Sequence, residues 1–252
     1  MRFGRMAIGV AAFAAGLGLS GCGLRDNRRI EMLEARAVAH REKGEFTQAI
    51  AAYDSIIAMR PERATVFNSR GITYQLAGQY ARAVADYDSA LKLRPDMSIA
   101  LKNRGRAHFY LGNFEPSARD LSAGLAGDTT NAFVAVWLHM VRQRLGTADT
   151  AELARNVART DPSEWPAPVA ALYLERITPE QFADSLSAGD PSERTLKRCG
   201  GAFFLGEYLL GRKRIDEAKA RFEEARSICR HDETEYMASV AELGRLGAME
   251  KR

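Results

Sequence analysis

Three cysteines are the side chains of this sequence whose type and position are most open to chemistry. Cys22 directly follows a long uncharged segment, whereas Cys199 and Cys229 lie near the other end of the sequence. A cysteine thiol can be acylated or oxidised to a disulfide. The sequence contains no H-E-x-x-H, G-x-S-x-G or Walker phosphate-binding motif and no Cys/His cluster. We therefore expect no catalytic residues, no metal and no cofactor.

Residues 1–21 have the pattern of a bacterial export signal. Arg2 and Arg5 give a positive start, and the uncharged run Met6–Leu19 is shorter than the roughly 17–25 residues of a spanning helix. The stretch Leu19-Ser20-Gly21-Cys22 resembles a lipobox, at which signal peptidase II cleaves before a cysteine that carries a diacylglyceryl group. We predict lipidation of Cys22, palmitate included. The alternative is an ordinary secretory signal with an incidental cysteine.

The residue after Cys22 bears on the destination of the anchored protein. Gly23, not aspartate, stands there, and the resemblance to Gram-negative lipoproteins then implies the periplasmic face of the outer membrane. An acylated Cys22 carries more than one chain, which is enough for stable anchoring. Residues 22–29 are expected to form a tether, whose arginines either touch anionic head groups or are solvated.

Composition favours an all-α protein and argues against nucleic acid as a partner. Alanine, arginine, leucine and glutamate dominate the sequence, and runs of β-branched residues are nearly absent. The formal net charge of +4 falls to about +2 (4 − 2) when Arg2 and Arg5 leave with the signal. So small a charge does not predict binding to a polyanion.

The elements that must position any binding residues repeat every 34 residues (78 − 44, from Gly78 and Gly44). In the segment Ala64–Pro95, apolar residues at i, i+3, i+4 and i+7 predict two amphipathic helices with a turn at Gly78. Gly71 and Ala83 are expected where the two helices approach closely, and large tyrosines fill the wider gaps. The same four kinds of position recur one period earlier and one period later. The equivalents of Gly71, Gly78, Ala83 and Tyr87 are, in that order, Ala37, Gly44, Ala49 and Tyr53 in the earlier repeat, and Gly105, Gly112, Ser117 and Leu121 in the later one.

This spacing resembles the tetratricopeptide-repeat (TPR) family. The resemblance implies a solenoid of helical hairpins whose first helices line an inner curve that binds peptides or partner helices. We expect three repeats over residues 30–129, a degenerate TPR or helical region over 130–198, and a C-terminal TPR-like hairpin with a capping helix over 199–252. Lys213 replaces the inter-helix glycine of that hairpin, so its turn should differ. Asp232 and Glu235 stand at capping-box spacing and predict the start of a solvating cap helix.

The register places Cys199 and Cys229 at the same end of the C-terminal hairpin. Cys199 stands at the start of its first helix and Cys229 at the end of its second helix. If Cys22 is lipidated, the other two are an even pair in an oxidising compartment. We predict a disulfide between them, with two buried thiols as the alternative.

The predicted protein-binding groove is lined by polar and aromatic side chains of the first helices. Such a mixture suits a peptide whose backbone groups need hydrogen bonds, although simple solvation is the alternative for each residue. Glu34 and Val38 occupy two positions at which the chaperone-type carboxylate clamp needs lysine and asparagine, so that scheme is not expected. The groove candidates are Glu34, Arg41, Asn68, Gln75, Lys102, Arg106, Phe109 and Tyr110.

Two further kinds of residue could belong to a binding site but are interpreted as packing residues. His40 and His108 lie two periods apart, with Tyr74 midway between them at the same repeat position. Trp137 and Trp165 fall in the degenerate region and are expected to be buried bulk.

The export signal, the repeats, the degenerate middle and the stretch AFFLGEYLLG together resemble NlpI-type TPR lipoproteins. That resemblance implies an adaptor, often a homodimer, that is anchored in the outer membrane and docks periplasmic proteases and peptidoglycan hydrolases without being an enzyme. The alternatives are a pilotin or pilus or secretion assembly lipoprotein, and an envelope enzyme whose site the sequence does not reveal.

Overall fold

The computed structural model describes residues 18–127, 129, 131–158, 160–161, 164–187 and 189–249, with side chains from residue 25 onward. These residues form thirteen α-helices and no strand, which confirms the predicted all-α class. Most of the expected signal segment lies outside the described residues, as do the side chains of the lipobox. Among the described helices, we find none with the length and apolarity needed to cross a lipid bilayer.

The chain divides into two compact units, residues 1–61 and residues 62–252. The described part of the first unit is one antiparallel hairpin of α1 (Gly18–Glu42) and α2 (Phe46–Met59). The helix α1 begins well before Ile30, the expected start of the first repeat. Residues 22–29 are therefore helical and continuous with the first TPR helix, so the expected tether is not an extended chain.

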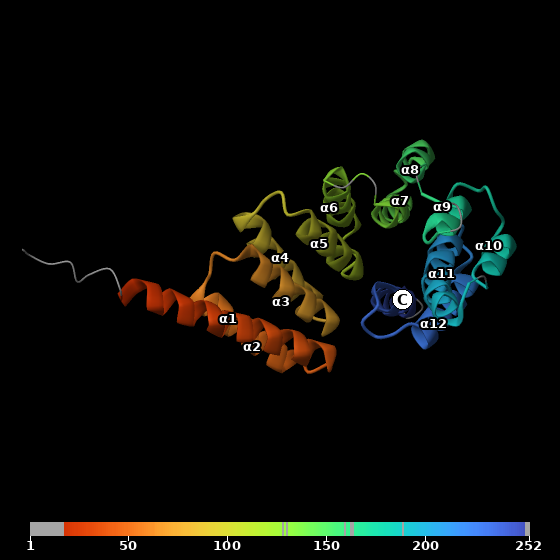
Figure 1. Cartoon of the computed structure of the whole chain (residues 1–252). Coiled ribbons are helices and arrows are strands. Elements are labelled where there is room, and N and C mark those ends of the chain that lie inside the picture. Colours follow the sequence, from red (N-terminus) through yellow and green to blue (C-terminus); the bar gives the residue numbers. More distant parts are fainter. Residues whose placement is uncertain are drawn as a thin grey trace, which may run out of the picture. The chain divides into compact units, whose positions relative to one another are not determined.

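The second unit begins with two hairpins of the predicted kind (Figure 1). Helix α3 (Ala64–Leu76) pairs with α4 (Tyr80–Leu93), and α5 (Ser98–Tyr110) pairs with α6 (Phe114–Ala126). The degenerate region consists of α7 (Ala132–Leu145), α8 (Thr150–Val157), α9 (Ala167–Tyr173) and α10 (Pro179–Ser185). The last elements are α11 (Pro191–Gly211), α12 (Ile215–Ile228) and α13 (Thr234–Met249).

In the hairpins α3/α4, α5/α6 and α11/α12, the two helices pack closely because a large side chain of the second helix lies against a glycine of the first. A Cβ added to Gly71 would lie 2.7 Å from the Tyr87 ring, and one added to Gly206 would lie 2.6 Å from the Phe222 ring. Both rings are fully buried. The helices can therefore approach closely, as the sequence predicts, only while this position carries no side chain.

An ion pair beside the glycine holds the two typical hairpins together. In α3 and α4, Arg70 donates two hydrogen bonds to the Asp86 carboxylate, at 2.8 and 2.6 Å. In α5 and α6, Arg104 does the same to Asp120, at 2.7 Å for each bond. Both carboxylates are buried, so these bidentate pairs add directional hydrogen bonds to the packing of the helices.

The inter-helix turns share one backbone geometry, including the turn that lacks glycine. Gly78 has a φ of 71° and Gly112 a φ of 79°, in the left-handed region. Lys213 has a φ of 61°. Its N–H donates to Leu210 O at 3.0 Å, as the N–H of Gly78 donates to Gln75 O at 3.0 Å. The expectation that this turn differs is wrong, because lysine adopts the conformation that glycine provides elsewhere.

Capping signals locate some helix starts correctly and others not. Thr178 and Gln181 form the predicted capping box of α10, and the Asp190 side chain accepts from the N–H groups of Ser192 and Glu193 at the start of α11. The expected box at Asp232 is wrong, since α13 begins at Thr234. Helix α13 is also more buried than a solvating cap, because it packs on α12, α11 and α5.

The strained turn gives a stability prediction. A lysine in the left-handed conformation destabilises the folded state by about 1–2 kcal/mol, and Lys213→Gly removes this strain. Glycine has more conformational freedom in the unfolded chain, which opposes the gain by about 0.5–1 kcal/mol. We expect Lys213→Gly to raise the free energy of unfolding by up to about 1 kcal/mol, measured by urea denaturation. Gly78→Ala is the matched control and should lower it. A Lys213→Gly protein less stable than the parent would contradict this interpretation.

Candidate protein-binding surface

The predicted groove residues of α3 are buried in hydrogen bonds between helices. Asn68 and Gln75 are each only 6% exposed. Asn68 Oδ1 accepts from Asn103 Nδ2 at 3.1 Å, and Gln75 Oε1 accepts from the Tyr87 hydroxyl at 3.3 Å. Their side chains therefore fix the packing of α3 against its neighbours and are not open to a ligand.

The two aromatic groove candidates are also covered. Phe109 is fully buried and Tyr110 is 5% exposed. The Phe109 ring lies edge-on to Trp137, with 5.3 Å between centroids, and the Tyr110 hydroxyl donates to Thr234 O of α13 at 3.4 Å. These residues do lie on the inner side of the first helices, but α13 and the aromatic core occupy that side.

Lys102 and Arg106 are the candidates of the second unit that remain partly exposed. They stand one turn apart on α5, so they share a face. The stem of Lys102 lies against Gly124 of α6, where a Cβ would meet Lys102 Cγ at 2.6 Å. Arg106 donates to Asn103 Oδ1 at 2.5 Å, which joins it to the buried amides of Asn103 and Asn68. Lys102 and Arg106 thus form a cationic pair on α5, in which the hydrogen bond to Asn103 holds the Arg106 side chain in place.

The remaining candidates belong to the first unit. Glu34 and Arg41 both lie on α1 and are partly exposed. Near the end of the same helix, His40 Nδ1 lies 2.5 Å from the Glu45 carboxylate, and this partner lowers the pKa of Glu45. In the second unit, burial lowers the pKa of His108.

Four ionisable side chains meet in the second unit, and the sequence patterns predict a role for none of them. Glu207 of α11 is 2% exposed and Glu242 of α13 is fully buried. Arg144 of α7 lies 3.2 Å from the Glu207 carboxylate and 3.3 Å from that of Glu242. Arg245 of α13 also pairs with Glu242. A lone glutamate inside the apolar stretch AFFLGEYLLG was the available signal, because a buried carboxylate needs a partner.

Burial perturbs two carboxyl groups of this region. Desolvation, and then the nearby charge of Glu242, raise the pKa of Glu207, while Arg144 and Arg245 oppose the shift. Burial also raises the pKa of Glu235, in the first turn of α13, to about 7. The docking of α13 therefore depends on groups that titrate above the usual range of carboxyl groups.

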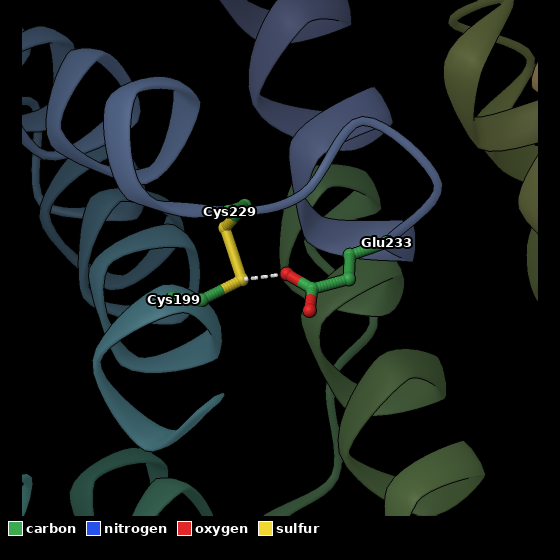
Figure 2. A group of neighbouring side chains, drawn as sticks. All are labelled: Cys199, Cys229 and Glu233. Atoms are coloured by element: carbon green, nitrogen blue, oxygen red, sulfur yellow. Dashed lines mark hydrogen bonds between the residues drawn. A yellow bond between two sulfur atoms is a disulfide. The ribbon is translucent and has the colours of Figure 1, made fainter. Parts of the chain in front are cut away.

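The two predicted disulfide partners lie together, as Figure 2 shows. Cys199 and Cys229 have their Cα atoms 5.0 Å apart, and their sulfurs are bonded. Glu233 Oε2 lies 2.9 Å from Cys199 Sγ and accepts from the Arg230 N–H at 3.0 Å. Among the described residues, Cys199, Cys229 and Glu233 are the one group of three potential metal-binding side chains that lie close enough together to hold an ion. Because each sulfur is bonded to the other, neither is available as a thiolate ligand.

The tryptophans differ in their surroundings. Trp137 is 1% exposed and stacks on Phe203, with 5.4 Å between centroids. Trp165 is partly buried beside Gly200 and is one of the residues that line a cavity of about 750 Å³. The polar side chains of that cavity include Asn131, Arg155, Asp161 and Glu164. Trp137 is thus core, whereas Trp165 borders an open space.

The disulfide prediction has a direct chemical test. Mature protein that is denatured without reductant should show no free sulfhydryl at Cys199 or Cys229. In the chain-entropy model, the double variant Cys199→Ser/Cys229→Ser should lose roughly 3–4 kcal/mol of stability. Reduced parent protein is the control and should match the variant. Two sulfhydryls titrated in the unreduced protein would reject the bridge.

The buried carboxyl group predicts a pH dependence of stability. Burial raises the pKa of Glu207 to about 8, so the folded protein holds a proton there that the unfolded chain releases near the ordinary glutamate pKa of 4.5. Stability should therefore fall as pH rises from that value through the raised pKa, by at most about 1.4 kcal/mol per pH unit. In urea denaturation between pH 5 and 8, Glu207→Gln should make this dependence shallower, leaving the part that comes from the raised pKa of Glu235, and exposed Glu223→Gln should leave the parent slope intact. Parallel curves for Glu207→Gln and the parent would contradict the assignment.

Comparison with known proteins identifies the repeats. A sequence profile described as tetratricopeptide repeat matches residues 34–74 and 68–132. A tetratricopeptide repeat protein from Parabacteroides merdae superposes with a TM-score of 0.57 at 15% identity, covering 84% of this chain and 84% of that chain. A MamA protein superposes with a TM-score of 0.50 at 17% identity, covering 80% of this chain and 92% of that chain. Residues 34–132 therefore consist of tetratricopeptide repeats, and the chain has the all-α TPR fold.

Proposed function

We propose that this chain is an adaptor that binds other proteins through its TPR helices while a lipid on Cys22 anchors it to the periplasmic face of the outer membrane. The observation that carries the binding role is the pair Lys102 and Arg106, partly exposed on one face of a TPR first helix. First helices present the concave surface on which such arrays bind peptides. The lipobox and the residue Gly23 support the anchor and its location.

The proposed partners are periplasmic proteins or peptides that offer acidic groups or backbone carbonyls to Lys102 and Arg106. Arg106 is oriented by Asn103, so part of the entropy of placing its guanidinium is lost before a partner arrives. By resemblance to NlpI-type lipoproteins, envelope proteases and peptidoglycan hydrolases are the partners to seek. The adaptor is proposed to be non-catalytic, since the buried carboxylates Glu207 and Glu242 are enclosed by Arg144 and Arg245 and cannot reach a substrate.

The test combines the anchor with the binding face. Radioactive palmitate should label the parent protein and not Cys22→Ala, and cell fractionation should place the parent in the outer membrane. Crosslinking from the anchored, tagged protein should capture periplasmic partners, and Lys102→Glu/Arg106→Glu should capture at least tenfold less of them. Arg119→Glu, on α6, is the control and should capture the parent amount.

Three outcomes would overturn parts of this proposal. An unlabelled parent protein would remove the anchor, and equal capture by the double variant would remove the α5 face. Purified protein that cleaves peptidoglycan or a protease substrate unaided would make it an enzyme. Loss of pili on deletion, with a normal cell wall, would favour the pilotin.

A further inference from the structure

Helix α13 covers the inner side of the second unit in the manner of a bound helix. It packs on α12 and then on α11 and α5, the first helices of two different hairpins. In Figure 1 it is the blue helix that ends at the label C, between α5 and α11. Phe109 and Tyr110, the aromatic residues expected to meet a ligand, meet α13 instead.

Both ends of α13 are tied to α5. Near its C-terminal end, Arg245 donates to Phe109 O and to Tyr110 O, both at 3.2 Å, and its guanidinium lies 5.2 Å from the centre of the Phe109 ring. At its N-terminal end, Thr234 O accepts from the Tyr110 hydroxyl. Carbonyls in the last turn of a helix lack partners one turn further on in the helix. The Gly112 N–H already donates to Phe109 O at 2.9 Å, so the cation of Arg245 adds a charged donor to this carbonyl and to that of Tyr110 at the negative end of α5.

The middle of α13 is bound by charge as well as by apolar contact. Glu242 pairs with Arg144 of α7 at 3.3 Å, and Arg144 also lies over the Phe114 ring, 4.9 Å from its centre. Of the buried residues of α13, the apolar ones are Met237, Ala238 and Leu246, and the polar ones are Glu235, Ser239 and Glu242. Such a mixed interface resembles one between separate proteins more than a domain core.

Helices α11 and α13 share the main apolar cluster of the second unit. Phe203, Phe204 and Leu209 of α11 are buried in it, and Met237, Ala238 and Leu246 of α13 complete it on the side that α13 covers. The covalent tie of α13 to the hairpins is the short segment after Cys229, whose bond to Cys199 holds that segment in place. If α13 leaves its seat, the disulfide stays intact, but the cluster loses Met237, Ala238 and Leu246, which a partner helix must replace.

We propose that α13 is the resident occupant of a helix-binding groove formed by α5, α7 and α11, and that a partner's amphipathic helix of the same pattern replaces it. The partner helix carries a glutamate followed three residues later by an arginine, as Glu242 and Arg245 do, with apolar residues in place of Met237 and Leu246. The glutamate meets Arg144, and the arginine meets the carbonyls at the end of α5. This inference rests on the proposed binding function and adds a second site to it, separate from the Lys102 and Arg106 pair.

Competition with the resident helix sets the expected affinity. The apparent dissociation constant of a partner helix is its intrinsic value divided by the fraction of molecules in which α13 has left. A variant that loosens α13 tenfold should bind the partner helix tenfold more tightly, which corresponds to about 1.4 kcal/mol.

The experiment uses the complete mature chain and a fluorescent peptide with the sequence of residues 232–249. Leu246→Ala in the protein weakens the resident helix on its buried side, while the peptide keeps the parent sequence. We expect the peptide to bind this variant at least tenfold more tightly than the parent protein, as measured by anisotropy. Val240→Ala removes carbon atoms from the exposed side of the same helix, where Val240 is 39% exposed, and should bind the peptide as the parent does.

A second pair of measurements separates groove binding from loss of structure. A peptide that carries Arg245→Ala should bind the Leu246→Ala protein at least tenfold more weakly than the parent peptide. If Leu246→Ala fails to fold by circular dichroism, the Arg245→Ala protein takes its place with the same expected gain. Equal affinity of the peptide for parent and loosened protein would overturn the proposal, as would equal affinity of parent and Arg245→Ala peptides. The crosslinking experiment with Lys102→Glu/Arg106→Glu tests the proposed function separately. Displacement of α13 can therefore be disproved while binding by Lys102 and Arg106 stands, and the reverse.

Discussion

The second unit depends on the close approach of two helices within each hairpin. This approach requires a position without a side chain on the first helix and a large ring or leucine on the second, as with Gly71 and Tyr87 or Gly206 and Phe222. Where the pattern is complete, Arg70–Asp86 and Arg104–Asp120 add bidentate ion pairs beside it. Every surface that the helices present to another protein is set by this spacing.

The hairpins leave an inner side that α13 fills. Its contacts there are partly apolar, through Met237, Ala238 and Leu246, and partly electrostatic, because Glu242 and Arg245 engage Arg144 and the carbonyl oxygens of α5. Removing one member of such a set leaves a buried charge without its partner, which costs more than the pair contributes. The network therefore specifies where α13 sits more than it adds to overall stability.

Sequence reasoning predicted the features that depend on local or periodic signals. The TPR hairpins, the small position at Gly71, the capping box of Thr178 and the cap at Asp190 all follow from residues close together or one repeat apart. The left-handed turn at Lys213 could not be predicted from its sequence, because lysine by itself disfavours the positive φ that glycine adopts in the other turns. There the conformation of the hairpin overrides the local preference of lysine.

The buried charges and the seat of α13 were missed for a different reason. Arg144 and Glu242 lie 98 residues apart, and no repeat period relates them. The groove candidates Phe109 and Tyr110 were placed on the correct side of α5, but their burial depends on a helix from the other end of the second unit. Such contacts have no pattern in one sequence, and only the glutamate in AFFLGEYLLG hinted that a buried cation lies opposite.

Native-state hydrogen exchange of the full chain tests most directly whether the inner side is a binding groove with a removable occupant. We expect the amides of α13 to exchange through local opening, well before those of α11 and with little dependence on denaturant. If the amides of α13 exchange only together with those of α11, through global unfolding, then α13 is a permanent part of the core and the groove is closed.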